Sequence, residues 1–183
     1  MASGPPRSEA GYAQVRGGAL AVLEPVIDHA FHYRERFDGA GLPLTPRLKL
    51  AVLTCMDSRI DVFDILGLQV GDAHVLRNAG GAATDDAIRS LAISQRAIGT
   101  QEILVLHHSD CGMLKLKMED FVSELESETG YRPSWLDEGF SDLGADVARS
   151  VAALRRSPFL RPGTPIRGVF YDVATGRVTE PCS

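Results

Sequence analysis

The sequence lacks the features that mark membrane, secreted and nucleic-acid-binding proteins. No apolar stretch approaches the roughly 20 residues that span a bilayer, and the N-terminal 18 residues contain no apolar segment of a secretory signal. Nineteen Lys and Arg stand against 24 Asp and Glu, without the basic run that nucleic acid requires. We therefore expect a cytoplasmic protein that binds neither membrane nor nucleic acid.

Cysteine is also scarce, at positions 55, 111 and 182 only. Three cysteines make a poor disulfide framework and fit a reducing compartment, and we expect Cys182 to be a free thiol without a role. Hydrophobic residues make up 44% of the 183 residues, enough for a core that needs no covalent support. Length predicts one domain. We place a flexible arm at residues 1–18, which are rich in Gly, Pro and Ser, and the folded domain at 19–183.

Short apolar runs alternate with helical patterns along the folded part. Three continuous apolar runs predict strands, at 48–53, 73–76 and 102–106. Apolar residues at helical spacing predict helices at 19–37, 61–66, 84–98, 114–129 and 145–155. A hairpin is expected near the end of the chain, with its turn at 174–176. This alternation predicts an α/β fold, a single domain with a mainly parallel central β-sheet flanked by helices.

Chemically reactive residues follow two of the predicted strands. Cys55 ends the first strand, and His108 and Cys111 follow the third. In open α/β sheets, ligands bind beyond the carboxyl ends of the strands, so these side chains converge if the two strands are neighbours. Thiolate and imidazole are ligands that zinc prefers. The sequence therefore predicts a zinc site made of one close pair, His108-x-x-Cys111, and one distant cysteine.

The number of ligands separates a structural from a catalytic zinc site. A structural site is closed by four protein ligands, commonly as two close pairs, whereas a catalytic site has three and a water molecule. The three ligands here leave a fourth position for water or for one further group. Zinc lowers the pKa of a bound water to about 7, which yields a hydroxide nucleophile at neutral pH.

Two charged residues follow Cys55 closely. Asp57 can accept a hydrogen bond from the zinc-bound water and orient it, or it can occupy the fourth position itself. Arg59 can hold that carboxylate in a bidentate pair and keep it ionised. Our hypothesis is a switch in which Asp57 blocks the zinc when bound to it and opens the site when paired with Arg59.

Three motifs together resemble the β-class carbonic anhydrases. They are CMDSR at 55–59, RNAGG at 77–81 and HSDCG at 108–112, within a stretch at 51–113 that is similar to the core of that family. The compact length and the run TDDAIRSLAISQ resemble the small prokaryotic branch. Either metal motif alone is weak, whereas the two at this separation on strand ends are specific.

The resemblance implies reversible hydration of carbon dioxide to bicarbonate and a proton. One zinc ion per chain would be bound by Cys55, His108 and Cys111, with Asp57 and Arg59 as the orienting or gating dyad. It also implies a homodimer or homotetramer, since the family's cleft lies at a dimer interface. The substrate pocket is expected to include a loop after the second strand and one glycine after the third: Asn78, Gly80, Gly81 and Gly112.

Other interpretations of these residues stay open. Carbon disulfide and carbonyl sulfide are linear electrophiles like carbon dioxide, and relatives of the implied fold hydrolyse them. A zinc-stabilised binding or redox-sensing module would use the same ligands without turnover. His107 is expected to point away from the site by strand alternation, and Ser109 and Asp110 to fix His108 or its turn. The proton shuttle, the oligomer size, bicarbonate regulation and the role of 118–140 are not predicted.

Overall fold

The computed structural model describes residues 22–133 and 143–180 and divides the chain into two units, residues 1–41 and 42–183. The first unit contains helix α1 (Leu23–His32) and the short 3₁₀ helix η2 (Tyr33–Arg36), where one helix over 19–37 was expected. Pro25 lies in the first turn of α1, where a missing N–H group costs no helical hydrogen bond. The arm predicted at 1–18 and Cys182 lie outside the described residues.

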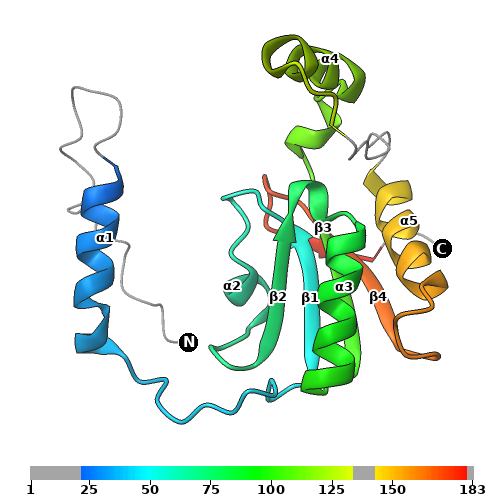
Figure 1. The fold of residues 1–183 in the computed structure, drawn as a ribbon. Coiled ribbons are helices and arrows are strands. Elements are labelled where there is room, and N and C mark those ends of the chain that lie inside the picture. The colour runs from blue at the N-terminus through cyan, green and yellow to red at the C-terminus, as the bar shows by residue number, and fades with distance from the viewer. Residues whose placement is uncertain (1–21, 134–142, 181–183) are drawn as a thin grey trace. The chain divides into compact units, whose positions relative to one another are not determined.

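The second unit is built on a five-stranded sheet with the order β2-β1-β3-β4-β5 (Figure 1). β1 pairs in parallel with β2 and β3, β3 pairs in parallel with β4, and β5 is antiparallel to β4. The strands are β1 (Leu50–Cys55), β2 (Ala73–Asn78), β3 (Glu102–His108), β4 (Ile166–Tyr171) and β5 (Val178–Thr179). The mainly parallel sheet predicted from the sequence is confirmed, and β4 and β5 form the expected hairpin.

Helices flank the sheet and connect its parallel strands. They are α2 (Val62–Leu66), α3 (Asp85–Ile93), α4 (Met118–Thr129) and α5 (Leu143–Arg156), with short turns η3 (Ala79–Gly81), η4 (Ser94–Ile98) and η5 (Gly112–Leu114). The side chains of Asp61 and Thr84 cap α2 and α3 by accepting backbone N–H groups. Gly67 ends α2 in the left-handed conformation that glycine adopts without strain.

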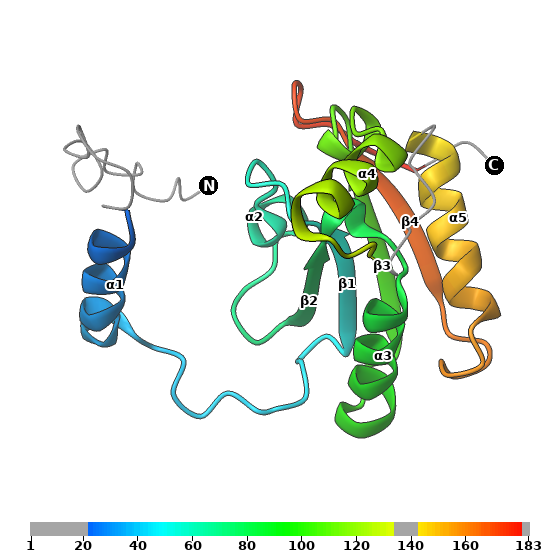
Figure 2. The same cartoon turned by 45° about the horizontal axis from the view of Figure 1, so that its top comes forward.

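Apolar residues fill both faces of the sheet. One cluster joins β1 and β3 to α3 and α5, and includes Leu53, Leu91, Val105 and Leu154. The other lies on the opposite face with α2, and Cys55 and Cys111 belong to it. α4 lies beyond the carboxyl ends of the strands, on the same side as those cysteines (Figures 1 and 2). The site is thus supported by a buried sheet on one side.

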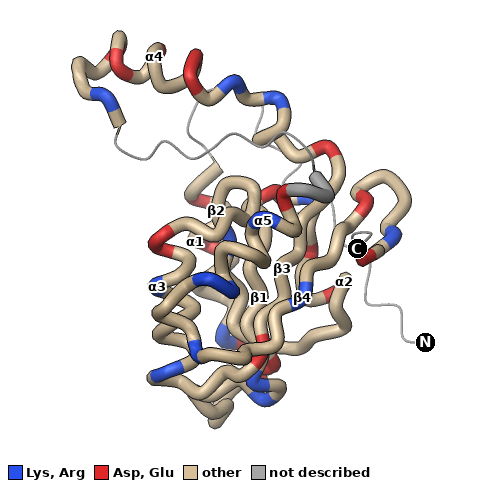
Figure 3. Tube along the Cα trace, turned by 90° about the vertical axis from the view of Figure 1, so that its right-hand side faces the viewer, with Lys and Arg blue, Asp and Glu red and all other residues tan. Residues whose placement is uncertain are grey.

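Charged residues of both signs are scattered along the described trace (Figure 3). No described helix is both long and apolar enough to cross a membrane.

Polar residues extend three strands beyond their predicted ends. β1, β2 and β3 each continue two residues further, so that Thr54-Cys55, Arg77-Asn78 and His107-His108 join the sheet. The buried hydroxyl of Thr54 donates to the carbonyl of Leu106 at 2.7 Å, so its burial leaves no polar group unsatisfied. Two of the three expected ligands, Cys55 and His108, therefore lie on strand ends, and Cys111 lies in the turn after β3.

Two predicted helices differ from the structure. The helix expected over 84–98 becomes a π turn at Ser94–Ile98, where the Ser94 hydroxyl is hydrogen-bonded to Thr100 at 2.7 Å and to the His74 ring at 2.8 Å. These tertiary bonds accompany the wider turn. The helix expected at 114–129 begins at Met118, because the residues after Cys111 form η5.

Candidate metal centre

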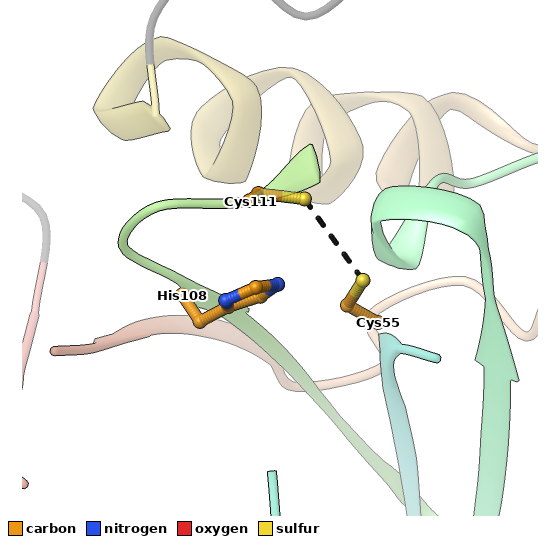
Figure 4. A group of neighbouring side chains, drawn as sticks. All are labelled: Cys55, His108 and Cys111. Carbon is orange, nitrogen blue, oxygen red and sulfur yellow. Dashed lines mark hydrogen bonds between the residues drawn. The ribbon is translucent and has the colours of Figure 1, made fainter. Parts of the chain in front are cut away.

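Three side chains converge at the carboxyl ends of β1 and β3. These strands are parallel neighbours, so Cys55 and His108 end at the same edge of the sheet, and the turn after β3 brings Cys111 back toward them (Figure 4). The ligand atoms of the three residues all lie within 4.8 Å of one another, and the two sulfur atoms are 3.9 Å apart. All three residues are buried. This is a compact set of two thiols and one imidazole.

The two ring nitrogens of His108 have different surroundings. Nδ1 lies 2.9 Å from the carbonyl oxygen of Ser109, which can only accept, so Nδ1 carries the proton. Nε2 is then an acceptor, and among the described residues this buried atom has no hydrogen-bond partner. A buried acceptor without a donor is costly unless a cation or another donor occupies the space beside it. His108 is therefore prepared in the tautomer that a metal ion requires.

The two thiols differ in acidity. Burial would raise the pKa of Cys55, but the neighbouring His108 ring and hydrogen bonds from the backbone N–H groups of Asp57 and Gly80 bring it down to about 7. Burial raises the pKa of Cys111 to about 11, and the neighbouring Cys55 adds to the rise. One thiolate therefore forms readily near neutral pH, whereas the second needs a cation beside it. A bound metal ion supplies that charge.

Asp57 and Arg59 form a bidentate ion pair beside this cluster. Arg59 donates through Nε to Oδ1 at 2.9 Å and through a terminal nitrogen to Oδ2 at 2.7 Å. The Arg59 hydrogen bond holds the pKa of the Asp57 carboxyl far below its usual range. Oδ2 of Asp57 lies 3.9 Å from Nε2 of His108. An ionised carboxylate thus stands at the open side of the ligand set.

Comparison with known proteins identifies the family. The carbonic anhydrase family model matches residues 50–178. Beta-carbonic anhydrase 1 of Mycobacterium tuberculosis is 45% identical over 161 residues, which cover 88% of this chain and 98% of that protein. The chain belongs to the β-carbonic anhydrase family. It is accordingly an enzyme of the carbonate dehydratase class, and the family supports hydration of carbon dioxide.

Solved structures and a second group of relatives extend the comparison. The carbonic anhydrase of Streptococcus mutans is 41% identical, with a TM-score of 0.81 over 90% of this chain and 100% of that one. A carbon disulfide hydrolase from Acidianus is 36% identical over 166 residues, covering 77% of this chain and 80% of that protein. This β-carbonic anhydrase is therefore similar both to carbonic anhydrases and to a carbon disulfide hydrolase.

The loop after β2 lies against the cysteine that ends β1. Gly80 directs its backbone N–H at the sulfur of Cys55. Gly81 has a φ of +71°, and a Cβ there would lie 3.0 Å from the backbone of Thr54, so a larger residue does not fit. Asn78 closes the loop by exchanging two hydrogen bonds of 2.8 Å with the backbone of Ala82. In this β-carbonic anhydrase the loop after β2 is therefore packed against the end of β1 that carries Cys55.

The expected pocket residues are not all in one place. A cavity of about 420 Å³ lies between β2 and α3, and of the four expected residues only Asn78 lines it. None of the three cluster residues lines this cavity. Gly112 is exposed at the start of η5, with open space where a Cβ would be. The cavity of this β-carbonic anhydrase thus does not include the cluster residues.

Two residues of the site escaped the sequence analysis. Arg77 donates to the backbone carbonyls of Cys55 at 3.0 Å and of Asp57 at 2.7 Å, and so fixes the segment that carries the first ligand. Its position beside Asn78 at a strand end was the available signal. Asp110, expected to fix His108 or its turn, also accepts hydrogen bonds from Arg59. The Ser109 carbonyl accepts from Nδ1 of His108 at 2.9 Å, and its hydroxyl accepts from the backbone N–H of Val173, 64 residues away, at 2.9 Å.

Proposed function

We propose that this β-carbonic anhydrase reversibly hydrates carbon dioxide to bicarbonate and a proton, with one zinc ion per chain. Cys55, His108 and Cys111 would hold the ion. The observation that carries the proposal is the buried Nε2 of His108, an acceptor that has no partner among the described residues and faces two sulfur atoms. Imidazole with two thiolates is a donor set that zinc accepts readily.

Asp57 and Arg59 would act on the reacting water. When bound, zinc would supply a Lewis acid that lowers the pKa of a coordinated water to about 7. The Asp57 carboxylate, held ionised by Arg59, would accept a hydrogen bond from that water and orient it toward carbon dioxide. In this arrangement the site is open. If Arg59 releases the carboxylate, Asp57 is near enough to occupy the fourth position and close the site.

The pocket and the assembly belong to the same proposal. Asn78, Gly80, Gly81 and Gly112 would form the wall past which carbon dioxide enters. The molecule would work as a homodimer or homotetramer in the cytoplasm, where reducing conditions keep the two described cysteines as thiols.

Carbon disulfide is the second candidate substrate, because a carbon disulfide hydrolase is 36% identical over 77% of this chain. Hydrolysis of carbon disulfide would use the same metal ligands. Which of the two substrates reacts would depend on which one the pocket lets reach the metal.

Stopped-flow hydration of carbon dioxide from about pH 6.5 to 9 tests the proposal, with zinc measured on the same sample. We expect about one zinc ion per chain and strong hydration, and removal of the zinc should abolish that activity. Activity confined to the alkaline end would mean that Asp57 binds the metal at neutral pH. A zinc-loaded protein without hydration at any pH would overturn the proposal, and sulfide release from carbon disulfide would then identify the second candidate.

A further inference from the structure

Asp110 connects the two segments that carry the metal ligands. Its carboxylate accepts a hydrogen bond from Arg59 at 2.8 Å, and its backbone carbonyl accepts a second at 3.0 Å. Arg59 follows β1, whereas Asp110 lies 51 residues later, between His108 and Cys111. The guanidinium is thus held between two carboxylates, Asp57 on one side and Asp110 on the other.

The pair of Asp57 and Arg59 would be weakly held without this third member. The Arg59 side chain is 44% exposed, and contact with solvent weakens the attraction between the two charges of an ion pair. A guanidinium with partners on both sides has fewer alternative conformations, because its planar donors are fixed in direction. Asp110 therefore supplies the contact that holds Arg59 in place against Asp57.

The backbone of Asp110 is shaped for this contact. Its φ is +53°, in the left-handed region that non-glycine residues adopt at some cost, with Asp and Asn among the most tolerant. Lys115 also contacts the carboxylate, with its Nζ 2.5 Å from Oδ1. Contacts of both the side chain and the carbonyl maintain a conformation that the local sequence alone would not favour.

We propose that Asp110 is a positioning residue, which holds Arg59 so that Asp57 stays paired with the guanidinium and off the metal. The proposal rests on the proposed function, in which the three ligands hold zinc and Asp57 opens or closes the fourth position. Without Asp110, Arg59 moves away more often, and the Asp57 carboxylate, 3.9 Å from the His108 nitrogen, becomes a fourth ligand. Loss of Asp110 should therefore tighten zinc binding while it lowers activity.

The variant Asp110→Asn tests this, since asparagine also tolerates the left-handed conformation but loses the charge. The first measurement is the rate at which the zinc-loaded protein releases its metal to an excess of chelator. We expect release to slow by about tenfold and carbon dioxide hydration at neutral pH to fall by about tenfold, the scale typical of residues next to metal ligands. Asp86→Asn is the matched control, because it removes a similar exposed Asp–Arg pair on α3 and should leave both quantities unchanged.

A double variant separates positioning from support of the turn. In the Asp57→Ala background, Asp110→Asn should no longer slow zinc release, since no carboxylate remains to bind the metal. Faster release in both backgrounds would mean that Asp110 only supports the turn, and unchanged release in both would mean that Arg59 needs no second partner. Either result overturns the inference. Because zinc release requires no turnover, it stays informative even if hydration fails.

Discussion

At the scale of single residues, the site depends on where each proton is held. His108 donates its Nδ1 proton to the carbonyl of the next residue, so the nitrogen facing the two sulfur atoms is an acceptor before any metal arrives. Arg59 keeps Asp57 ionised in the same way. The conformational entropy of these side chains is lost during folding, so binding of a metal ion would need little further rearrangement.

Asp57→Ala distinguishes a catalytic from a structural role of this residue. Because Cys55, His108 and Cys111 would still hold the proposed zinc, we expect about one ion per chain to remain while hydration falls by about 100-fold or more, the scale of losing a proton-handling group. Zinc content by mass spectrometry and stopped-flow hydration measure the two effects, with Asp86→Ala as the control. Loss of the metal together with the fold would instead favour a structural site.

The three residues that converge in the cluster could be predicted from the sequence, but the contacts of their neighbours could not. Cysteine and histidine that follow parallel strands have few functional roles, and the spacing of Cys55, His108 and Cys111 favours a metal site among them. Asp110 and Arg77 are ordinary charged residues, whose partners depend on directions set by the folded backbone. No local sequence pattern predicts the positive φ of Asp110. The same holds for the strand register that places Arg77 beside Thr54.

At the scale of elements, helix α5 packs tightly on strand β4 at a glycine. A Cβ at Gly168 would overlap the side chain of Val147 and lie 3.2 Å from Val151. We predict that Gly168→Ala lowers the free energy of unfolding by about 1–3 kcal/mol, because the buried Val147 and Val151 would have to shift to make room for the methyl group. Urea unfolding followed by circular dichroism measures this value.

Gly112→Ala is the matched control, since its Cβ would meet no atom within 4 Å and its φ is not positive. Its unfolding free energy should change by less than about 0.5 kcal/mol. An equal loss in both variants would show that the contact of α5 with β4 is not the cause.

Element types were predicted better than element ends, for a physical reason. Apolar runs indicate strands, but strands also continue where polar side chains find partners, as Thr54 does with Leu106. The π turn at Ser94 accompanies hydrogen bonds to Thr100 and His74, which apolar spacing does not show. The predicted strands thus ended two residues early at the point where the site begins.

At the scale of the whole molecule, a buried carboxyl links stability to pH. Asp72 accepts two hydrogen bonds from Arg47, at 2.7 and 3.0 Å, and one from the backbone of Gln69. The Arg47 hydrogen bond lowers the pKa of Asp72 below its ordinary value. The stabilisation is therefore present above the unfolded-state pKa of about 4 and is lost as the pH falls through the lower folded value.

Asp72→Asn tests this linkage. The variant should be less stable than the parent at pH 7, and the difference should shrink as the pH is lowered below about 4. Chemical unfolding of both proteins over this range measures the difference directly. A difference independent of pH would assign the effect to packing rather than to charge.

The apolar side of α1 bears on the assembly. Within its own unit none of its ten residues is buried, and its apolar residues include Ile27 and Phe31. We predict that a second copy covers this side. Burying each such side chain contributes about 1.5–3 kcal/mol, so Ile27→Ser with Phe31→Ser should weaken self-association by at least about tenfold. Sedimentation velocity measures the effect, and Asp28→Ser on the same helix should leave the assembly intact.

The strand order β2-β1-β3 also has a consequence for how the chain folds. Cys55, His108 and Cys111 come together only after β1 and β3 have paired, and β2 and α3 lie between these strands in the sequence. Strands that are distant in the sequence pair slowly, because the entropy cost of closing a long loop comes before the stabilising contacts form. The time at which a refolding chain begins to bind zinc would then report when β1 and β3 pair. If the ligands meet only after the folding barrier, zinc leaves the refolding rate unchanged and prolongs the lifetime of the folded enzyme.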